Sequence, residues 1–240
     1  LSDTSFSCID AGVNSITIYV KDDYGNLDSC IANVTVVDTA SPTILCKDTT
    51  VYLDVLGNFV IDTSFVLVSA SDACGVDSVY LSDTLFSCAD TGTNQVTVYV
   101  KDIRGNLDSC VSTVTVRDVM LPTLICKDTS VYLDAFGTVT IDTSFVLISA
   151  IDACGIDSVY LSKNSFLCGE VGANSVTIFA RDNSGNIDSC SATVTVIDSI
   201  PPTILCKDTS VYLDALGTVA IDTSFVVVSV TEGCGIDSVY

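Results

Sequence analysis

The sequence predicts an all-β protein made of tandem antiparallel β-sandwiches, with about seven strands in each 80-residue module. Three observations carry this prediction. The stretch Gly25 to Cys46, GNLDSCIANVTVVDTASPTILC, returns from Gly105 and again from Gly185, which sets a fixed period of 80 residues. Short runs rich in Val, Ile, Thr and Tyr alternate with turn residues, as in sandwiches. No segment shows a helical period of useful length.

The strands of one module can be predicted from residues 39–118. The clearest alternation lies in Gln95–Lys101, where Val96, Val98 and Val100 fall on one face of a strand. Turn residues separate such runs, for example in the Asp102–Asn106 hairpin turn. The strands expected in order are Thr43–Cys46, Thr50–Asp54, Phe59–Ile61, Phe65–Ser69, Val76–Ser82, Gln95–Lys101 and Cys110–Val116.

The period also divides the chain. It gives the C-terminal half of a module at 1–38, whole modules at 39–118 and 119–198, and the N-terminal half of a module at 199–240. Each half-module would expose half of a hydrophobic core, which is not a stable surface for a soluble chain. We therefore expect either that the chain continues at both ends, which we favour, or that a neighbouring chain completes each end.

Charge excludes several classes of partner. The formal net charge is −21, with nine Lys and Arg against 28 Asp and two Glu. This balance repels nucleic acid and anionic membrane surfaces. No apolar run approaches 18 residues, so we expect no membrane insertion. The excess of Asp fits either simple solubility or the binding of divalent cations.

Cysteine is the second compositional signal. The chain has 12 Cys, four in each repeat at identical spacings. An 80-residue unit buries only about 60% of its extended-chain surface, so its core alone is marginal. Regularly spaced Cys in small β-rich units indicate a disulfide framework made in an oxidising compartment. Zinc is not favoured, because there is no His and no CxxC pair.

Several motifs together resemble a known family. The series PTILC, DACG, FSC and NxVTVxVxDxxGNxxSCxxTVTVxD is similar to the hyalin repeat (HYR) domain, an immunoglobulin-like sandwich, as found in long arrays on large bacterial surface proteins. The resemblance covers the whole chain. It implies an extracellular or cell-surface location and a role in adhesion or as a spacer, without catalysis. Antibody domains match less well, because Trp is absent and the Cys positions differ.

The cysteine spacing does not by itself determine which cysteines pair. Four Cys in a module allow three connectivities. The first and last strands of such sandwiches often run side by side, which favours the pairs Cys46–Cys110 and Cys74–Cys88, with Cys126–Cys190 and Cys154–Cys168 in the next module. By the same logic we expect Cys8, Cys30, Cys206 and Cys234 to pair outside these 240 residues.

No catalytic constellation is present, and we expect the chain not to be an enzyme. The usual general base is missing because the chain has no His, and the Cys are committed to bridges. We expect no cofactor, with calcium as the alternative. The candidate calcium ligands are aspartates of the linkers and of the DxxGN and DACG turns, namely Asp22, Asp38, Asp72, Asp102, Asp118, Asp152, Asp182 and Asp198. The competing interpretation is turn chemistry, in which Asp bonds its own backbone.

Covalent glycans are a further expectation. Asn33 lies in the sequence Asn-Val-Thr, which is an N-glycosylation sequon. Asp-Ser and Asp-Thr pairs followed by an aliphatic residue resemble the O-glycosylation signal of some bacteria whose surface proteins carry these repeats. The candidates are Thr39, Ser78, Thr84, Ser158 and Ser199. The alternative is that such triplets are common in any β-protein rich in Asp, Ser and Thr.

These observations favour a structural role. We expect a repeat segment of an extracellular filament, stalk or giant surface protein, with rigid, disulfide-stapled modules end to end. The expected partners are further copies of the repeat, in the same chain or in neighbouring chains. The alternative is an adhesin module that binds a ligand or glycan. It is less favoured because the loops are mostly repeated and the aromatic residues fall in strands.

Overall fold

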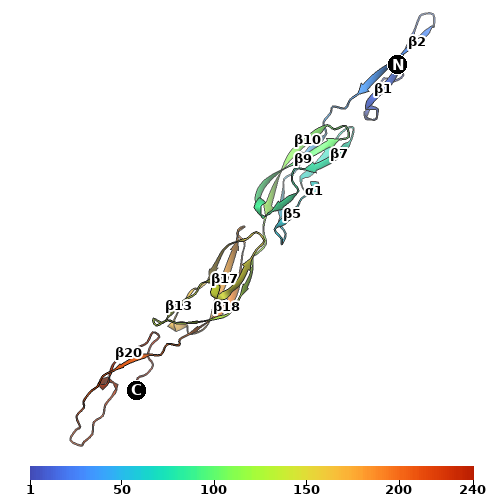
Figure 1. The fold of residues 1–240 in the computed structure, drawn as a ribbon. Helices are drawn as coiled ribbons and strands as arrows, with labels where there is room; N and C mark the ends of the chain where they lie inside the picture. The colour runs from blue at the N-terminus through green and yellow to red at the C-terminus, as the bar shows by residue number, and fades with distance from the viewer. The chain divides into compact units, whose positions relative to one another are not determined.

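The computed structural model describes all 240 residues, which divide into two compact units, Leu1–Val119 and Met120–Tyr240 (Figure 1). Unit 1 contains η1 (Cys8–Asp10), β1 (Gly12–Lys21), β2 (Leu27–Val36), β3 (Thr43–Cys46), β4 (Thr49–Tyr52), β5 (Asn58–Val60), α1 (Thr63–Val66), β6 (Leu67–Ser71), β7 (Val76–Leu81), β8 (Leu85–Ser87), η2 (Cys88–Asp90), β9 (Gly92–Asp102) and β10 (Leu107–Arg117). Unit 2 contains β11 (Thr123–Cys126), β12 (Thr129–Tyr132), β13 (Thr138–Thr140), α2 (Thr143–Val146), β14 (Leu147–Ile151), β15 (Ile156–Leu161), β16 (Ser165–Leu167), η3 (Cys168–Glu170), β17 (Gly172–Asp182), β18 (Ile187–Ile197), β19 (Thr203–Cys206), η4 (Thr223–Phe225) and β20 (Val227–Thr231).

Each unit holds one complete module with the same topology. In unit 1 a four-stranded sheet has the order β4-β10-β9-β7, with β4 parallel to β10 and the other pairs antiparallel. Two strand pairs, β3-β6 and β5-β8, form the second layer. Unit 2 repeats this plan with the sheet β12-β18-β17-β15 and the pairs β11-β14 and β13-β16. The prediction of an all-β sandwich is confirmed.

The core follows from the period-two alternation of the long strands. Val96, Val98 and Val100 of β9 are fully buried, and so are Val114 and Val116 of the neighbouring strand β10. In unit 2 the corresponding face packs against apolar residues from the first half of the module, including Val131, Leu133 and Ile141. Both halves of the module therefore contribute to one core.

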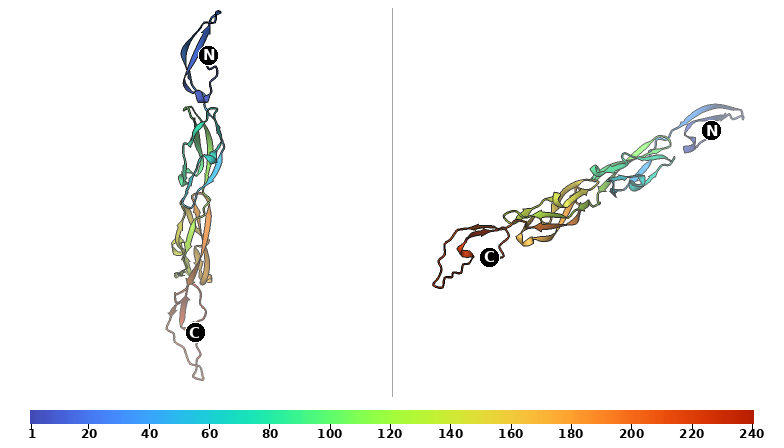
Figure 2. Two further views of the ribbon diagram at one scale, coloured as in Figure 1. Left: turned by 90° about the vertical axis from the view of Figure 1, so that its right-hand side faces the viewer. Right: turned by 60° about the horizontal axis from the view of Figure 1, so that its bottom comes forward.

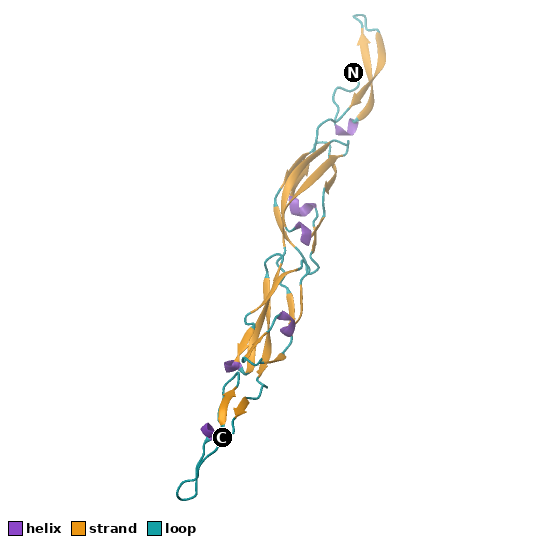
Figure 3. Ribbon diagram, turned by 60° about the vertical axis from the view of Figure 1, so that its left-hand side comes forward, coloured by secondary structure: helices purple, strands orange, loops and turns teal.

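Two local details differ from the sequence prediction. Eight strands form in the module 39–118 instead of seven, because the three-residue strand β8 pairs with β5. Thr63–Val66 is one helical turn, although the sequence predicts a strand from Phe65. The carboxylate of Asp62 accepts a hydrogen bond from the Ser64 amide at 2.8 Å, which caps this turn. Figure 3 shows such short helices among the strands, and no helix is long and apolar enough to cross a membrane.

A disulfide joins the two layers of each complete module. Cys46 of β3 bonds to Cys110 of β10, and Cys126 of β11 bonds to Cys190 of β18, each with Cα atoms 6.0 Å apart. These are two of the pairs expected from the strand order. Each closes a long loop, with a sequence separation of 64 residues, and therefore restricts the unfolded chain by an entropy worth about 4 kcal/mol.

Replacing Cys46 and Cys110 together by Ala is expected to lower the free energy of unfolding of that module by about 2–5 kcal/mol. The transition can be followed by circular dichroism in urea. The matched control is Cys30→Ala, because Cys30 is an exposed free thiol. Equal unfolding midpoints for the double variant and the control would show that the bridge does not stabilise the sandwich.

Candidate functional site

The candidate site is the junction where one module meets the next. In unit 1 Cys8, from the half-module 1–38, forms a disulfide with Cys74 of the following module. In unit 2 Cys168 of the module 119–198 bonds to Cys234 of the following half-module. Both bridges span 66 residues, with Cα atoms 5.2 and 5.1 Å apart. At these two junctions the neighbouring modules are therefore joined twice, by the chain and by a disulfide.

Two of the predicted disulfide pairs are wrong. The predicted pairs Cys74–Cys88 and Cys154–Cys168 do not form, because Cys74 bonds to Cys8 and Cys168 bonds to Cys234. Cys8 and Cys234 therefore have partners inside these 240 residues, contrary to expectation. Cys88 and Cys154 are also disulfide-bonded. A module is therefore not a closed disulfide framework, because the short 3-10 helix that begins at Cys8 is bonded to the next module. Cys30 and Cys206 are free thiols here.

Hydrogen-bonded turns carry both cysteines of the Cys8–Cys74 bridge. On one side, the Ser7 amide and hydroxyl donate to one carboxylate oxygen of Asp10 at 2.8 and 2.9 Å, which closes the 3-10 turn that begins at Cys8. On the other side, Asp72 Oδ1 accepts hydrogen bonds from the amides of Cys74 and Gly75 at 2.7 and 3.1 Å. This Asx turn fixes the direction of the Cys74 side chain.

Two hydrogen bonds reinforce the unit 1 junction. The guanidinium of Arg104 donates to the Cys8 carbonyl at 2.9 Å, and the Asn106 side chain donates to the Asp38 carbonyl at 3.3 Å. Both donors lie in or beside the β9-β10 turn and reach the preceding half-module and its linker. Sequence reasoning missed Arg104, since the corresponding positions carry Tyr24 and Ser184 and the repeat gives no signal for it.

Three of the predicted calcium ligands, the aspartates that open the DxxGN turns, accept hydrogen bonds from their own turns. One carboxylate oxygen of Asp102 accepts from the amides of Arg104 and Asn106, and the other accepts from the Asn106 side chain. Burial acts to raise the pKa of Asp102, but these hydrogen bonds outweigh it and lower the pKa. Asp22 has the same pattern, and the Asn26 side chain is the main cause of its lowered pKa. Asp182 repeats the same bonds.

Three further predicted ligands, Asp38, Asp72 and Asp198, lie at the junctions within the two units. Ligand atoms of Asp38, Asp72 and Cys74 lie within 4.8 Å of one another. Asp38 Oδ1 accepts from the Ala40 amide at 3.0 Å, while Asp38 Oδ2 is buried and has no hydrogen-bond partner. The Cys74 sulfur is in a disulfide and is not a thiolate ligand. Asp198, Glu232 and Cys234 repeat this cluster in unit 2.

Asp118 and Asp152 complete the set of predicted ligands. Asp118 is buried at the end of unit 1. Asp152 is half-buried in unit 2, and its carboxylate accepts from the Cys154 amide at 2.8 Å, as Asp72 does from Cys74. Asp152 therefore shapes its own turn in the same way as Asp72.

The predicted glycosylation positions are mostly accessible. Thr39, Thr84 and Ser199 are exposed and lie outside regular strands. Asn33 is exposed on β2, where its side-chain oxygen accepts from the Ser15 hydroxyl at 2.8 Å. The hydroxyl-bearing residues Ser78 and Ser158 are half-buried on β7 and β15. Exposure permits modification, and glycosylation stays a prediction.

Comparison with known proteins identifies the module. Residues 117–196 match the family model described as the HYR domain. These residues form an HYR domain. Hyalin of Strongylocentrotus purpuratus is 30% identical over 235 residues, which cover 93% of this chain and 20% of that protein. Hyalin of Lytechinus variegatus is 29% identical over 226 residues, covering 88% and 41%. The chain thus spans between a fifth and two fifths of these relatives.

Solved structures of cadherin and immunoglobulin domains align with this chain at low sequence identity. Human protocadherin-24 EC1-2 aligns with a TM-score of 0.39 and 15% identity, covering 67% of this chain and 100% of that one. Sidekick-1 immunoglobulin domains 1–4 align with a TM-score of 0.38 and 11% identity, covering 80% and 60%. The HYR match and the hyalin relatives indicate an extracellular or surface module of the adhesion type, from a family that is not enzymatic.

A substitution at Gly137 tests how tightly the chain is packed around the Cys168–Cys234 bond. Its φ is +71°, and a Cβ there would lie 2.3 Å from the Cys168 sulfur. Gly137→Ala is therefore expected to reduce formation of the Cys168–Cys234 bond severalfold, measured by mass spectrometry of non-reduced digests. Gly217→Ala is the matched control, since Gly217 has a φ of +75° and open space around it. Equal bond formation in both variants would contradict this packing.

The turn carboxylate Asp102 should make stability depend on pH. Its folded pKa is lowered, so its stabilising effect is fully present above the unfolded pKa of about 3.9 and is lost as the pH falls through the folded pKa. We expect the melting temperature of Asp102→Asn to change less than that of the parent chain across this acid range. Asp23→Asn, at an exposed residue, is the control. Parallel curves for all three proteins would contradict the assignment.

Proposed function

We propose that this chain is a structural repeat segment of an extracellular filament, stalk or giant surface protein, whose modules are stapled end to end. One observation carries the proposal: the Cys8–Cys74 and Cys168–Cys234 bonds connect consecutive modules instead of closing loops within one. A second covalent connection at a junction limits bending and twisting, which an array that transmits load requires. A set of independent binding modules gains nothing from it. The bacterial source implied by the resemblance stays a prediction.

The junction bonds also change the path of mechanical force along the chain. Tension that enters at Cys8 passes through the sulfur atoms to Cys74 and bypasses the residues between them. Each junction bridge shields a loop with a sequence separation of 66 residues. At about 3.3–3.6 Å per extended residue, each loop hides about 220–240 Å of chain. In the oxidised chain these two loops would stay closed even when a sandwich opens.

Single-molecule force spectroscopy of the whole chain tests this proposal. Without reductant, unfolding should release none of the length held in these two loops. With reductant, contour-length gains that include both loops should appear. The matched variants are Cys8→Ser with Cys74→Ser, which opens one junction, and Cys30→Ser, which alters only a free thiol. Equal extension with and without reductant would overturn the load-bearing role.

The aromatic residues support a structural role over the adhesin alternative. Tyr80 of β7 and Tyr99 of β9 lie opposite each other and stack with ring centroids 5.1 Å apart. Tyr160 and Phe179 repeat this pair in unit 2. Cross-strand aromatic pairs stabilise sheets. A pair repeated in each module at the same register fits a uniform array better than a specialised ligand site.

Calcium binding at the junction is a second candidate function. The buried Asp38 oxygen without a hydrogen-bond partner favours it, together with the nearby Asp72 carboxylate. A bound cation would offset the repulsion of two partly desolvated carboxylates. Isothermal titration of the oxidised chain with calcium is expected to give binding that Asp38→Asn weakens and Asp23→Asn leaves unchanged. Identical titrations for both variants would reject this site.

A further inference from the structure

Two tyrosine side chains stack on the outer face of the four-stranded sheet in unit 1. Tyr80 of β7 lies directly opposite Tyr99 of β9, and the ring centroids are 5.1 Å apart with an angle of 18° between the ring planes. Opposite residues of an antiparallel pair project from the same face of the sheet, so both phenol ends point away from it. The labels β7 and β9 stand side by side in Figure 1, and both strands lie in the teal and green part of the views in Figure 2.

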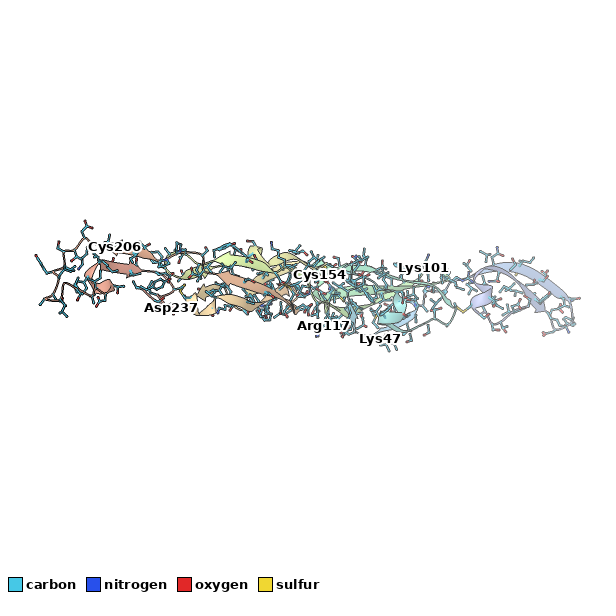
Figure 4. The ribbon with its side chains drawn as sticks, turned by 90° about the horizontal axis from the view of Figure 1, so that it is seen from below. Lys47, Lys101, Arg117, Cys154, Cys206 and Asp237 are labelled. Atoms are coloured by element: carbon cyan, nitrogen blue, oxygen red, sulfur yellow. A yellow bond between two sulfur atoms is a disulfide. The ribbon has the colours of Figure 1, made fainter.

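A soluble oxidant can reach this pair of tyrosines. Tyr80 is 47% exposed, and Tyr99 is half-buried. Lys101, which is labelled in Figure 4, follows Tyr99 by two residues on the same face of β9 and is exposed. The alternate residues Val98 and Val100 are buried in the core. The two phenols therefore lie on the solvent side of the sheet and not in the interior of the sandwich.

We propose that Tyr80 and Tyr99 form a site of oxidative coupling, at which a peroxidase and hydrogen peroxide join the two rings into an intramolecular dityrosine. The new bond connects the two ring carbons that lie next to the phenol oxygens. Such coupling requires that the two oxidised rings meet. The strand register keeps these rings stacked in the folded chain, so the reaction becomes unimolecular and is favoured over coupling between chains.

The covalent step involves only the two phenols and the oxidant. The peroxidase, itself oxidised by hydrogen peroxide, removes one electron and one proton from each phenol and gives two tyrosyl radicals. The two unpaired electrons form a bond between the carbons next to the phenol oxygens, and the hydrogen on each of these carbons moves to its phenol oxygen. Two tyrosines and one hydrogen peroxide therefore give one dityrosine and two water molecules.

Unit 2 carries the same stack without the second phenol. Tyr160 of β15 lies opposite Phe179 of β17, with ring centroids 5.1 Å apart and an angle of 16° between the ring planes. Tyr160 is 45% exposed, close to the value for Tyr80. A phenylalanine ring has no hydroxyl group and gives no phenoxyl radical. The two stacks therefore differ by one hydroxyl group, and unit 2 is an internal control.

The coupling anchors the strand that receives tension from the junction. Cys74 lies two residues before β7 and is bonded to Cys8, so tension on this bridge passes into β7. Because β7 is the edge strand in the order β4-β10-β9-β7, its one neighbour in this sheet is β9. A carbon–carbon bond between Tyr80 and Tyr99 fixes the edge strand to that neighbour. This mechanical role rests on the load-bearing function proposed above, whereas the coupling does not.

Treatment of the dilute full chain with a plant peroxidase and hydrogen peroxide tests the site. We expect dityrosine fluorescence from chains that stay monomeric in denaturing electrophoresis. Mass spectrometry should recover a linked pair of peptides, containing Tyr80 and Tyr99, that is two hydrogens lighter than their sum. Tyr99→Phe should lower the fluorescence of the monomer severalfold. The matched control is Tyr52→Phe, since Tyr52 is 53% exposed and lies opposite Arg117, and this variant should couple like the parent.

Phe179→Tyr provides a gain of coupling in unit 2 that does not depend on the loss of a native group. This variant is expected to yield a second linked pair of peptides, which joins Tyr160 to position 179. Absence of this pair, equal fluorescence of the parent and Tyr99→Phe, or dityrosine found only between chains would each overturn the proposal. The readout is chemical, so its result is separate from that of the force measurement on the junction disulfides.

Discussion

The small size of the HYR module is the constraint on which the rest of this structure depends. About 80 residues bury only a modest share of their extended-chain surface, so the core alone gives marginal stability. Two kinds of disulfide add stability to the chain. One joins the layers of a sandwich, as Cys46–Cys110 does, and the other joins consecutive modules, as Cys8–Cys74 does. Stability within a module and order between modules thus come from the same four cysteines per repeat.

The junction shows how local sequence serves a longer-range function. Asp72 shapes the turn that carries Cys74, and Asp10 closes the 3-10 turn that carries Cys8. In so acidic a chain both carboxylates could be interpreted as solubilising surface charge. Each instead accepts hydrogen bonds within its own turn. The aspartates that open the DxxGN turns are likewise committed to their own backbone. Only Asp38 keeps a buried oxygen without a hydrogen-bond partner.

Sequence patterns predicted the sandwich and the bridge between its layers. The alternation in β9 and the fixed period of 80 residues are strong signals that can be found in one sequence. They did not predict the partner of Cys74, because periodic spacing is equally compatible with bonds inside a module and bonds to the preceding one. The helical turn at Thr63–Val66 was also missed, because an N-cap at Asp62 overrode the β-propensity of Phe65 and Val66. Arg104 could not be found, since it occurs in one copy only.

The identical segments at 129–132 and 209–212 show that strand formation here depends on tertiary context. Val131 is buried beside β18, and without such a partner strand the same residues stay irregular. The module is therefore a cooperative unit assembled from two halves, and its boundaries can be crossed by a covalent bond without loss of the fold.

Peptide mapping of the non-reduced chain tests most directly whether disulfides join consecutive modules. Mass spectrometry of a proteolytic digest should recover a linked pair of peptides that contains Cys8 and Cys74, and another that contains Cys168 and Cys234. Recovery of Cys74 linked to Cys88, with Cys8 as a free thiol, would contradict the staple between modules.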